Sequence, residues 1–94
     1  MHQLPDIPLP ASYRAEVLQA LFDLGAAPTA MTPPRIVYSF LRALMTFEIR
    51  DRKAKRRELE HFFGPQPLVD YQREIEALRS KYSLLRRPLS EWVR

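Results

Sequence analysis

The chain contains no cysteine, no asparagine and only two glycines in 94 residues. Without cysteine it can form no disulfide, use no thiol nucleophile and build no cysteine-based zinc site. Tight β-hairpin turns depend on glycine and asparagine at positions with positive φ, so the shortage of both argues against a hairpin-rich β fold. The composition therefore favours helices.

Long apolar runs and a signal-like N-terminus are also missing. No segment approaches the roughly 18 consecutive apolar residues that a membrane-spanning helix needs, and charged residues make up 28% of the chain. The first ten residues, MHQLPDIPLP, lack the basic start and apolar centre of a signal peptide. We therefore expect a cytoplasmic protein with no membrane partner.

The N-terminal arm, residues 1–10, is rich in proline. Its three prolines alternate with Leu4, Ile7 and Leu9, and proline at this density favours an extended, polyproline-like conformation. The arm is either disordered or lays these apolar side chains on a neighbouring surface. The remaining residues, 11–94, are expected to form a single helical domain.

Apolar periodicity and end signals predict two helices before residue 64. The first, from about Ala11 to Leu24, carries one apolar stripe and ends at Gly25. The second, Thr32–Phe63, is long for a globular protein; Thr32 is a suitable N-cap, and the prolines that follow it suit a first turn. Gly64 and the proline after it supply the stop signal. The second helix is apolar on two sides in its first half and on one side beyond it.

A third helix is predicted after Pro67, where apolar residues recur at a strict 3-4-3-4-3 spacing. This is the a/d pattern of a coiled-coil seam. The seam residues are Leu68, Tyr71, Ile75, Leu78, Tyr82 and Leu85. Pro88 should break the helix near Arg87. The short link 64–67 makes the second and third helices antiparallel neighbours.

Antiparallel pairing brings particular side chains together. The expected pairs are Phe47 with Tyr82, Leu44 with Leu85, Phe40 with Leu89, Ile36 with Trp92, Ala54 with Ile75 and Leu78, and Asp51 with Arg79. The predicted fold class is all-α: a three-helix domain with a long, coiled-coil-like, antiparallel hairpin of helices two and three. Because such a hairpin buries little alone, we expect a homodimer through these two helices.

The basic segment, residues 50–57 (RDRKAKRR), holds six cations and one acid. Its net charge of +5 exceeds the +4 of the whole chain, so one patch accounts for the basic character. The candidate binding residues are Arg50, Arg52, Lys53, Lys55, Arg56 and Arg57. The segment is either a solvated helix face with pairs such as Glu48–Arg52 and Asp51–Lys55, or a surface for phosphates or an acidic protein. Because no aromatic residue interleaves the cations, readout of single-stranded bases is disfavoured.

No motif indicates catalysis, a cofactor or a metal. A glycine-rich phosphate loop and a Gly-x-Ser-x-Gly nucleophile motif are both absent. Glu58 and His61 match half of a di-iron carboxylate site, but that chemistry needs a second such motif and two further carboxylates. We therefore expect a protein that is not an enzyme, with no cofactor and no metal site.

Apolar and aromatic residues of the hairpin provide a candidate protein interface. Its members are Phe62, Phe63, Leu68, Tyr71, Ile75 and Leu78. Phe63 points away from the seam and is the best single candidate for a contact with another chain. The sequence thus predicts a small protein–protein interaction, assembly or regulatory factor whose partner is a second copy or another, acidic, protein. The alternative is a nucleic-acid-associated factor that binds the phosphate backbone through the basic segment.

Overall fold

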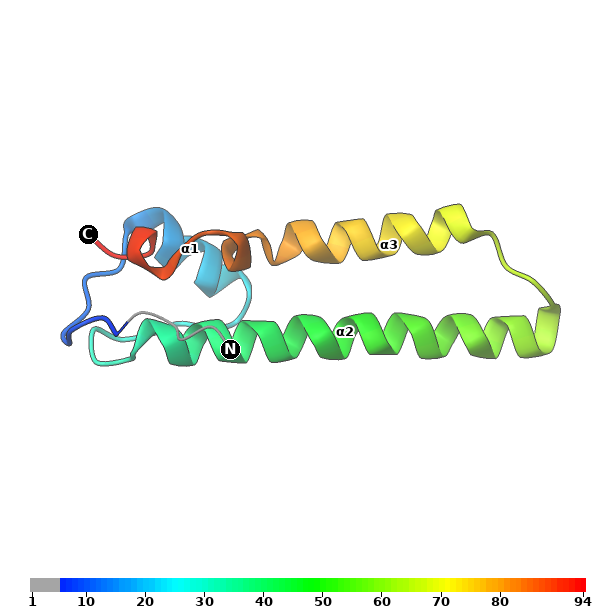
Figure 1. Cartoon of the computed structure of the whole chain (residues 1–94), viewed down its shortest axis with the longest axis horizontal. Helices are drawn as coiled ribbons and strands as arrows, with labels where there is room; N and C mark the ends of the chain where they lie inside the picture. Colours follow the sequence, from blue (N-terminus) through cyan, green and yellow to red (C-terminus); the bar gives the residue numbers. More distant parts are fainter. Residues whose placement is uncertain (1–5) are drawn as a thin grey trace. The chain divides into compact units, whose positions relative to one another are not determined.

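The computed structural model of the chain describes residues 6–94 (Figure 1). Its elements are α1 (Ala15–Asp23), α2 (Pro34–Phe63), α3 (Leu68–Lys81) and two short 3₁₀ helices, η1 (Ser83–Arg86) and η2 (Leu89–Glu91). α2 and α3 pack against each other, which confirms the predicted all-α fold with a hairpin of helices two and three. Of the predicted arm, residues 1–5 lie outside the described part, and residues 6–10 contain neither helix nor strand.

Contacts divide the described chain into two compact units. The core unit takes in the described residues up to Leu41 together with Leu84–Arg94, and the hairpin unit is Arg42–Ser83. The continuous helix α2 contributes its first turns to the core unit and the rest to the hairpin unit. The expected Leu44–Leu85 contact would join the two units and stays a prediction, as does the single domain over residues 11–94.

Both glycines end helices, as predicted, and both have a φ of 80°. After α1 the amide of Gly25 donates to Phe22 O at 3.0 Å, and the amide of Ala26 donates to Leu21 O at 2.8 Å. These two bonds form a Schellman motif. After α2 the amide of Gly64 donates to Glu60 O at 3.0 Å, the single bond of the αL motif. A positive φ is strained for any residue with a Cβ, which is why glycine occupies both positions.

The first two helices begin later than predicted. α1 starts at Ala15 rather than near Ala11, because Tyr13 forms an isolated antiparallel bridge with Val93. The predicted N-cap of α2 is wrong: its first amides donate to Pro33 O, and Thr32 Oγ1 instead accepts a hydrogen bond at 3.0 Å from the amide of the residue three positions before it. Thr32 therefore closes the preceding turn and does not cap the helix.

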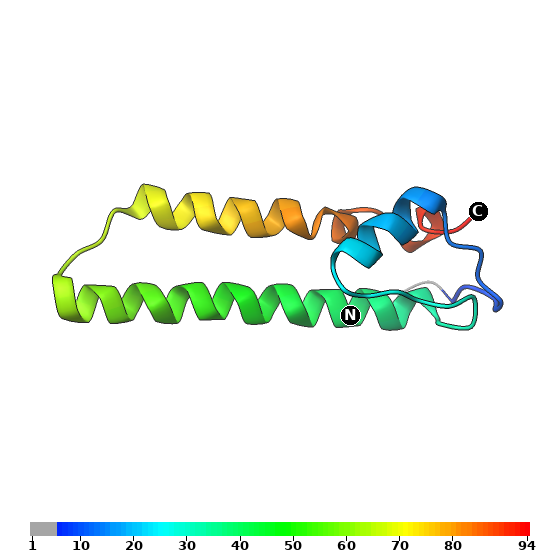
Figure 2. The ribbon, with the colours of Figure 1, turned by 180° about the vertical axis from the view of Figure 1, so that it is seen from behind.

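Trp92 lies at the centre of the core unit and is fully buried. Its indole Nε1 donates to Leu84 O at 3.3 Å, and its ring centroid lies 6.2 Å from that of Tyr38. Its backbone carbonyl accepts a hydrogen bond at 2.9 Å from the amide of Arg14, which places the last turns beside α1 in both views (Figures 1 and 2). Four further fully buried side chains surround it in this core: Val17, Leu21, Pro34 and Leu41.

The third helix is shorter than predicted. α3 ends at Lys81, and the chain continues in η1 and η2 instead of remaining helical to Arg87. Leu84 is buried whereas Leu85 is only partly buried, so the heptad phase is lost after α3. The residues that follow pair with the start of the chain, where Arg94 donates its amide to Ser12 O at 2.9 Å. Backbone groups used in this way cannot also continue a helical ladder.

Within the core unit, α2 buries only one of its two predicted apolar faces. Val37 and Leu41 are buried, whereas Ile36 and Phe40 are 55% and 50% exposed. The ring next to Trp92 is that of Tyr38, whereas Ile36 was the expected neighbour. The face predicted to meet the third helix is therefore largely exposed, and the buried face lies about one residue, or 100°, around the helix from it. Both stripes of α2 are apolar, so periodicity alone could not distinguish them.

In the hairpin unit α3 runs antiparallel to α2 (Figure 1). Along the pair, increasing residue numbers on α2 meet decreasing residue numbers on α3. Glu48 contacts Lys81, Arg52 contacts Glu74 and Arg56 contacts Tyr71. The buried side chains of this unit are Leu78 and Tyr82. Charged and aromatic side chains thus occupy much of the interface between the two helices.

The apolar layers predicted for this interface are wrong. Phe47 is 70% exposed, and the neighbour of Tyr82 on α2 is Glu48. Ala54 is exposed and not buried in a layer with Ile75 and Leu78 as predicted. The polar groups of α2 that face α3 have opposite charges or a hydroxyl as their partners there.

Candidate interaction site on the helical hairpin

The structure divides the basic segment into two sets of cations. One set forms ion pairs and consists of Arg52, Lys55 and Arg56. The other set is exposed and consists of Arg50, Lys53 and Arg57. None of these three forms an ion pair with a carboxylate of residues 6–94. The segment is therefore neither wholly neutralised nor wholly available to a partner.

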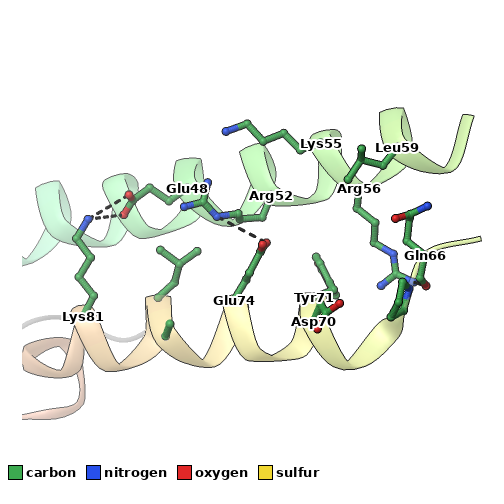
Figure 3. Close-up of a pocket in the computed structure, with 13 residues that line it drawn as sticks. Glu48, Arg52, Lys55, Arg56, Leu59, Gln66, Asp70, Tyr71, Glu74 and Lys81 are labelled. Carbon is green, nitrogen blue, oxygen red and sulfur yellow. Dashed lines mark hydrogen bonds and ion pairs between the residues drawn. The ribbon is translucent and has the colours of Figure 1, made fainter. Parts of the chain in front are cut away.

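Arg52 and Lys55 share the carboxylate of Asp51. Lys55 Nζ lies 3.1 Å from Asp51 Oδ2, which confirms the predicted i,i+4 pair. Arg52 lies 3.4 Å from the same oxygen and 3.8 Å from Glu74 Oε2 on α3 (Figure 3). It forms no direct ion pair with Glu48, but its charge helps to lower the pKa of Glu48, in keeping with the predicted i,i+4 pairing. The carboxylate of Asp51 is thus held by its own helix and forms no ion pair with Arg79, the second partner predicted for it.

Arg56 ties the loop at the end of the hairpin to both helices. Its Nε donates to Glu60 Oε1 at 2.8 Å, and its Nη2 donates to Gln66 O at 3.5 Å. The guanidinium also lies 4.9 Å from the ring centroid of Tyr71, within the range of a cation–π contact. Gln66 Nε2 in turn donates to Gly64 O at 3.0 Å. Arg56 is therefore a structural residue of the hairpin, and Figure 3 shows it extending towards Gln66 and Tyr71.

A second polar cluster lies where α3 ends. Lys81 Nζ lies 3.1 Å from Glu48 Oε1, and the hydroxyl of Tyr82 donates to Glu48 Oε2. The hydrogen bond from Tyr82 lowers the pKa of Glu48, and Lys81 adds to this effect. Burial, together with the hydrogen bond to Glu48, raises the pKa of Tyr82 to about 12. Both shifts favour the charged carboxylate and the neutral phenol, the protonation states that hold the helices together.

Acid is expected to destabilise the hairpin unit through Glu48. The pKa of Glu48 is lower in the folded state. Its contribution to the free energy of unfolding is therefore present above the ordinary pKa of 4.5 and is lost as the pH falls through the folded-state pKa. Tyr82 has the corresponding effect at alkaline pH. Its contribution to the free energy of unfolding is complete below pH 10.0 and is lost as the pH rises through about 12. Urea denaturation followed by circular dichroism from neutral to acid pH measures the first effect.

Glu48→Gln should reduce the loss of stability that the wild type shows between neutral and acid pH. Glu76→Gln is the matched control, because Glu76 is exposed on α3 and forms no ion pair with residues 6–94. Equal acid dependence in the wild type and in Glu48→Gln would contradict the assignment to Glu48.

A groove of about 650 Å³ opens between α2 and α3 (Figure 3). Its charged lining residues are Glu48, Arg52, Lys55, Arg56, Asp70, Glu74 and Lys81. Most of these charges pair with one another, and the pairs Glu48–Lys81 and Arg52–Glu74 link the two helices across the groove. Among residues 6–94 no three or more histidine, aspartate or glutamate side chains gather in a way that could hold a metal ion.

The hairpin tip, defined as Phe62, Phe63, Leu68 and Val69, exposes large apolar side chains. Their exposed fractions are 69%, 76%, 53% and 55%, respectively. Phe62 and Phe63 end α2, and the other two begin α3, so the four positions flank one short loop. A group of exposed apolar side chains on one end of an element is typical of a protein–protein contact.

The predicted interface residues fall into two groups. Phe62, Phe63 and Leu68 belong to the hairpin tip. The other three are covered to different degrees within the hairpin: Tyr71 and Ile75 are half-buried and Leu78 is buried. The heptad pattern could not find Val69, which is out of phase with the seam, nor could it assign Glu48 to the polar cluster.

A scan against protein-family models and searches of curated proteins and of solved structures found no match to this chain. In the part of the chain that the structure describes, no helix combines the length and the hydropathy that a membrane span requires.

Proposed function

We propose that the chain is a non-catalytic protein–protein interaction factor that acts in assembly or regulation, and that the hairpin tip docks on another protein chain. The observation that carries this proposal is the exposure of Phe62, Phe63, Leu68 and Val69 at the end of the hairpin. Large aromatic side chains of this kind provide most of the binding energy in many interfaces. A cytoplasmic location is part of the proposal and depends on the sequence alone.

The composition of the hairpin supports a need for a partner. Leu78 and Tyr82 are the buried side chains of the unit, and most of its ion pairs are partly or largely exposed. Exposed ion pairs contribute only about 0–1 kcal/mol each. Small units without disulfides often depend on association for their stability. We propose a second copy of the chain as the first partner, which would remove both hairpin tips from water.

Replacing Phe62 and Phe63 with serine together is expected to abolish self-association. The wild type should be a dimer at micromolar concentration, and the double variant should be a monomer of 11.1 kDa, because two aromatic anchors are lost from the contact. Light scattering coupled to size-exclusion chromatography measures the mass of each protein.

Phe22→Ser combined with Phe40→Ser is the matched control for this experiment. These side chains are 68% and 50% exposed, and both belong to the core unit. The control variant should dimerise like the wild type. A monomeric wild type across the micromolar range would exclude the second copy as partner, and an unchanged dimer of the Phe62/Phe63 variant would exclude the hairpin tip.

A further inference from the structure

A second unpartnered surface lies on α2 within the hairpin unit. The outer face, defined as Phe47, Arg50, Ala54, Arg57 and His61, consists of exposed residues at 3-4-3-4 spacing. This spacing places them on one stripe about 21 Å long, since each residue rises 1.5 Å along the helix. At 100° per residue the stripe lies roughly opposite Arg52, which contacts α3. The outer face therefore lies away from the α2–α3 interface, and only its last residue, His61, meets the hairpin tip, through a ring contact of 5.0 Å with Phe62.

The outer face has the pattern of a helix-docking surface. Phe47, Ala54 and His61 recur every seven residues, and the small side chain of Ala54 permits close approach of a second helix backbone. Arg50 and Arg57 alternate with them at the other heptad position, and neither is ion-paired within residues 6–94. An occupant must therefore offer apolar side chains and carboxylates in alternation.

We propose that the outer face binds an acidic amphipathic helix of another protein, whose carboxylates at heptad spacing meet Arg50 and Arg57 and whose apolar residues meet Phe47 and Ala54. Charge complementarity carries this assignment, because two arginines one heptad apart form no ion pair with any carboxylate of residues 6–94. Lys53 borders the face on one edge and Glu58 on the other, so the partner's carboxylates belong on the Lys53 side.

Other occupants fit this surface less well. In a parallel pair with a second copy, Arg50 would meet Arg50 and Arg57 would meet Arg57. In an antiparallel pair the Lys53 edges of the two helices would meet, and the carboxylate on that edge, Glu60, is already paired with Arg56, so Lys53 would find no free carboxylate there. A nucleic-acid backbone would use the arginines but would leave Phe47, which is 70% exposed, without a contact.

Fluorescence anisotropy with a synthetic peptide tests the proposal on the intact chain. The probe is a helical peptide of about three heptads that alternates leucine and glutamate at the a and d positions, with alanine and glutamine elsewhere. A scrambled peptide of the same composition and a duplex DNA serve as competing probes. The helical peptide should bind at micromolar concentration, and the other two probes at least about tenfold more weakly at physiological salt.

Arg50→Glu combined with Arg57→Glu should weaken peptide binding at least about tenfold. The matched control is Arg42→Glu combined with Arg73→Glu, which makes the same change in net charge at exposed positions of the hairpin unit. It should weaken binding less than about threefold, because distant surface charges are screened. Circular dichroism of both variants confirms that exposed charge reversals leave the helices intact.

Four results would overturn the proposal: no binding of the helical peptide, equal binding of the scrambled peptide, tighter binding of duplex DNA, or equal losses in the two double variants. The serine substitutions at Phe62 and Phe63 provide an independent readout. If they abolish the dimer but leave peptide binding unchanged, the hairpin tip and the outer face are separate surfaces. Failure of one proposal is therefore distinguishable from failure of the other.

Discussion

Replacing Trp92 with alanine is expected to lower the free energy of unfolding of the core unit by about 3–5 kcal/mol. The side chain is fully buried and is the largest in this core, so its removal leaves a cavity among rigid neighbours. It also removes the hydrogen bond from the indole to Leu84 O and the ring contact with Tyr38. Urea denaturation followed by far-UV circular dichroism measures the loss, because the variant has no tryptophan for fluorescence.

Two comparison variants separate cavity formation from other effects. Trp92→Phe keeps an aromatic ring but loses the indole donor, so it should cost less than the alanine variant. Phe22→Ala removes a ring that is 68% exposed and should change stability by no more than about 0.5 kcal/mol. A loss below about 1 kcal/mol for Trp92→Ala would contradict the central position of this side chain.

Leu78→Asp is expected to separate α3 from α2 and to cost about 3–5 kcal/mol. Leu78 is 5% exposed and is the most buried aliphatic side chain of the hairpin unit. The substitution removes its apolar contacts and places a carboxylate in a position without a partner. The measurement is amide hydrogen exchange, in which the amides of α3 should lose most of their protection.

Ala77→Asp is the matched control for the hairpin. Ala77 is the preceding residue, is exposed, and lines the groove between the two helices. Aspartate at this position should leave protection of α3 close to that of the wild type, since surface substitutions typically change stability by about 0.5 kcal/mol or less. Equal loss of protection in both variants would show that added negative charge, and not loss of the buried leucine, opens the hairpin.

Local signals in the sequence were enough to predict the helices and their stops. Gly25 and Gly64 end α1 and α2 because the chain there adopts a positive φ, a backbone requirement that a sequence displays directly. The rotation of α2 was not predictable in the same way. Ile36 and Val37 are both apolar and differ by 100° around the axis, and a hydrophobic pattern with two stripes fits either rotation.

The division of the basic segment depends on contacts that are distant in the sequence. Arg52 and Glu74, or Glu48 and Lys81, have no local pattern that pairs them, because each pair forms only once α3 has folded back on α2. The sequence predicted that the segment was basic and on a helix. It could not separate Arg56, which holds the loop, from Arg50 and Arg57, which face away. That distinction requires the register and the rotation of both helices.

The core unit is assembled from two stretches of chain that the hairpin separates. During synthesis, Val17, Leu21 and Leu41 emerge from the ribosome before Trp92 exists to cover them. The bridge between Tyr13 and Val93 likewise closes only after all of Arg42–Ser83 has been made. Contacts between such distant residues are slow to form. The apolar side chains of the core unit that are made first therefore stay uncovered until the final segment has been made, and uncovered apolar surface of this kind favours aggregation.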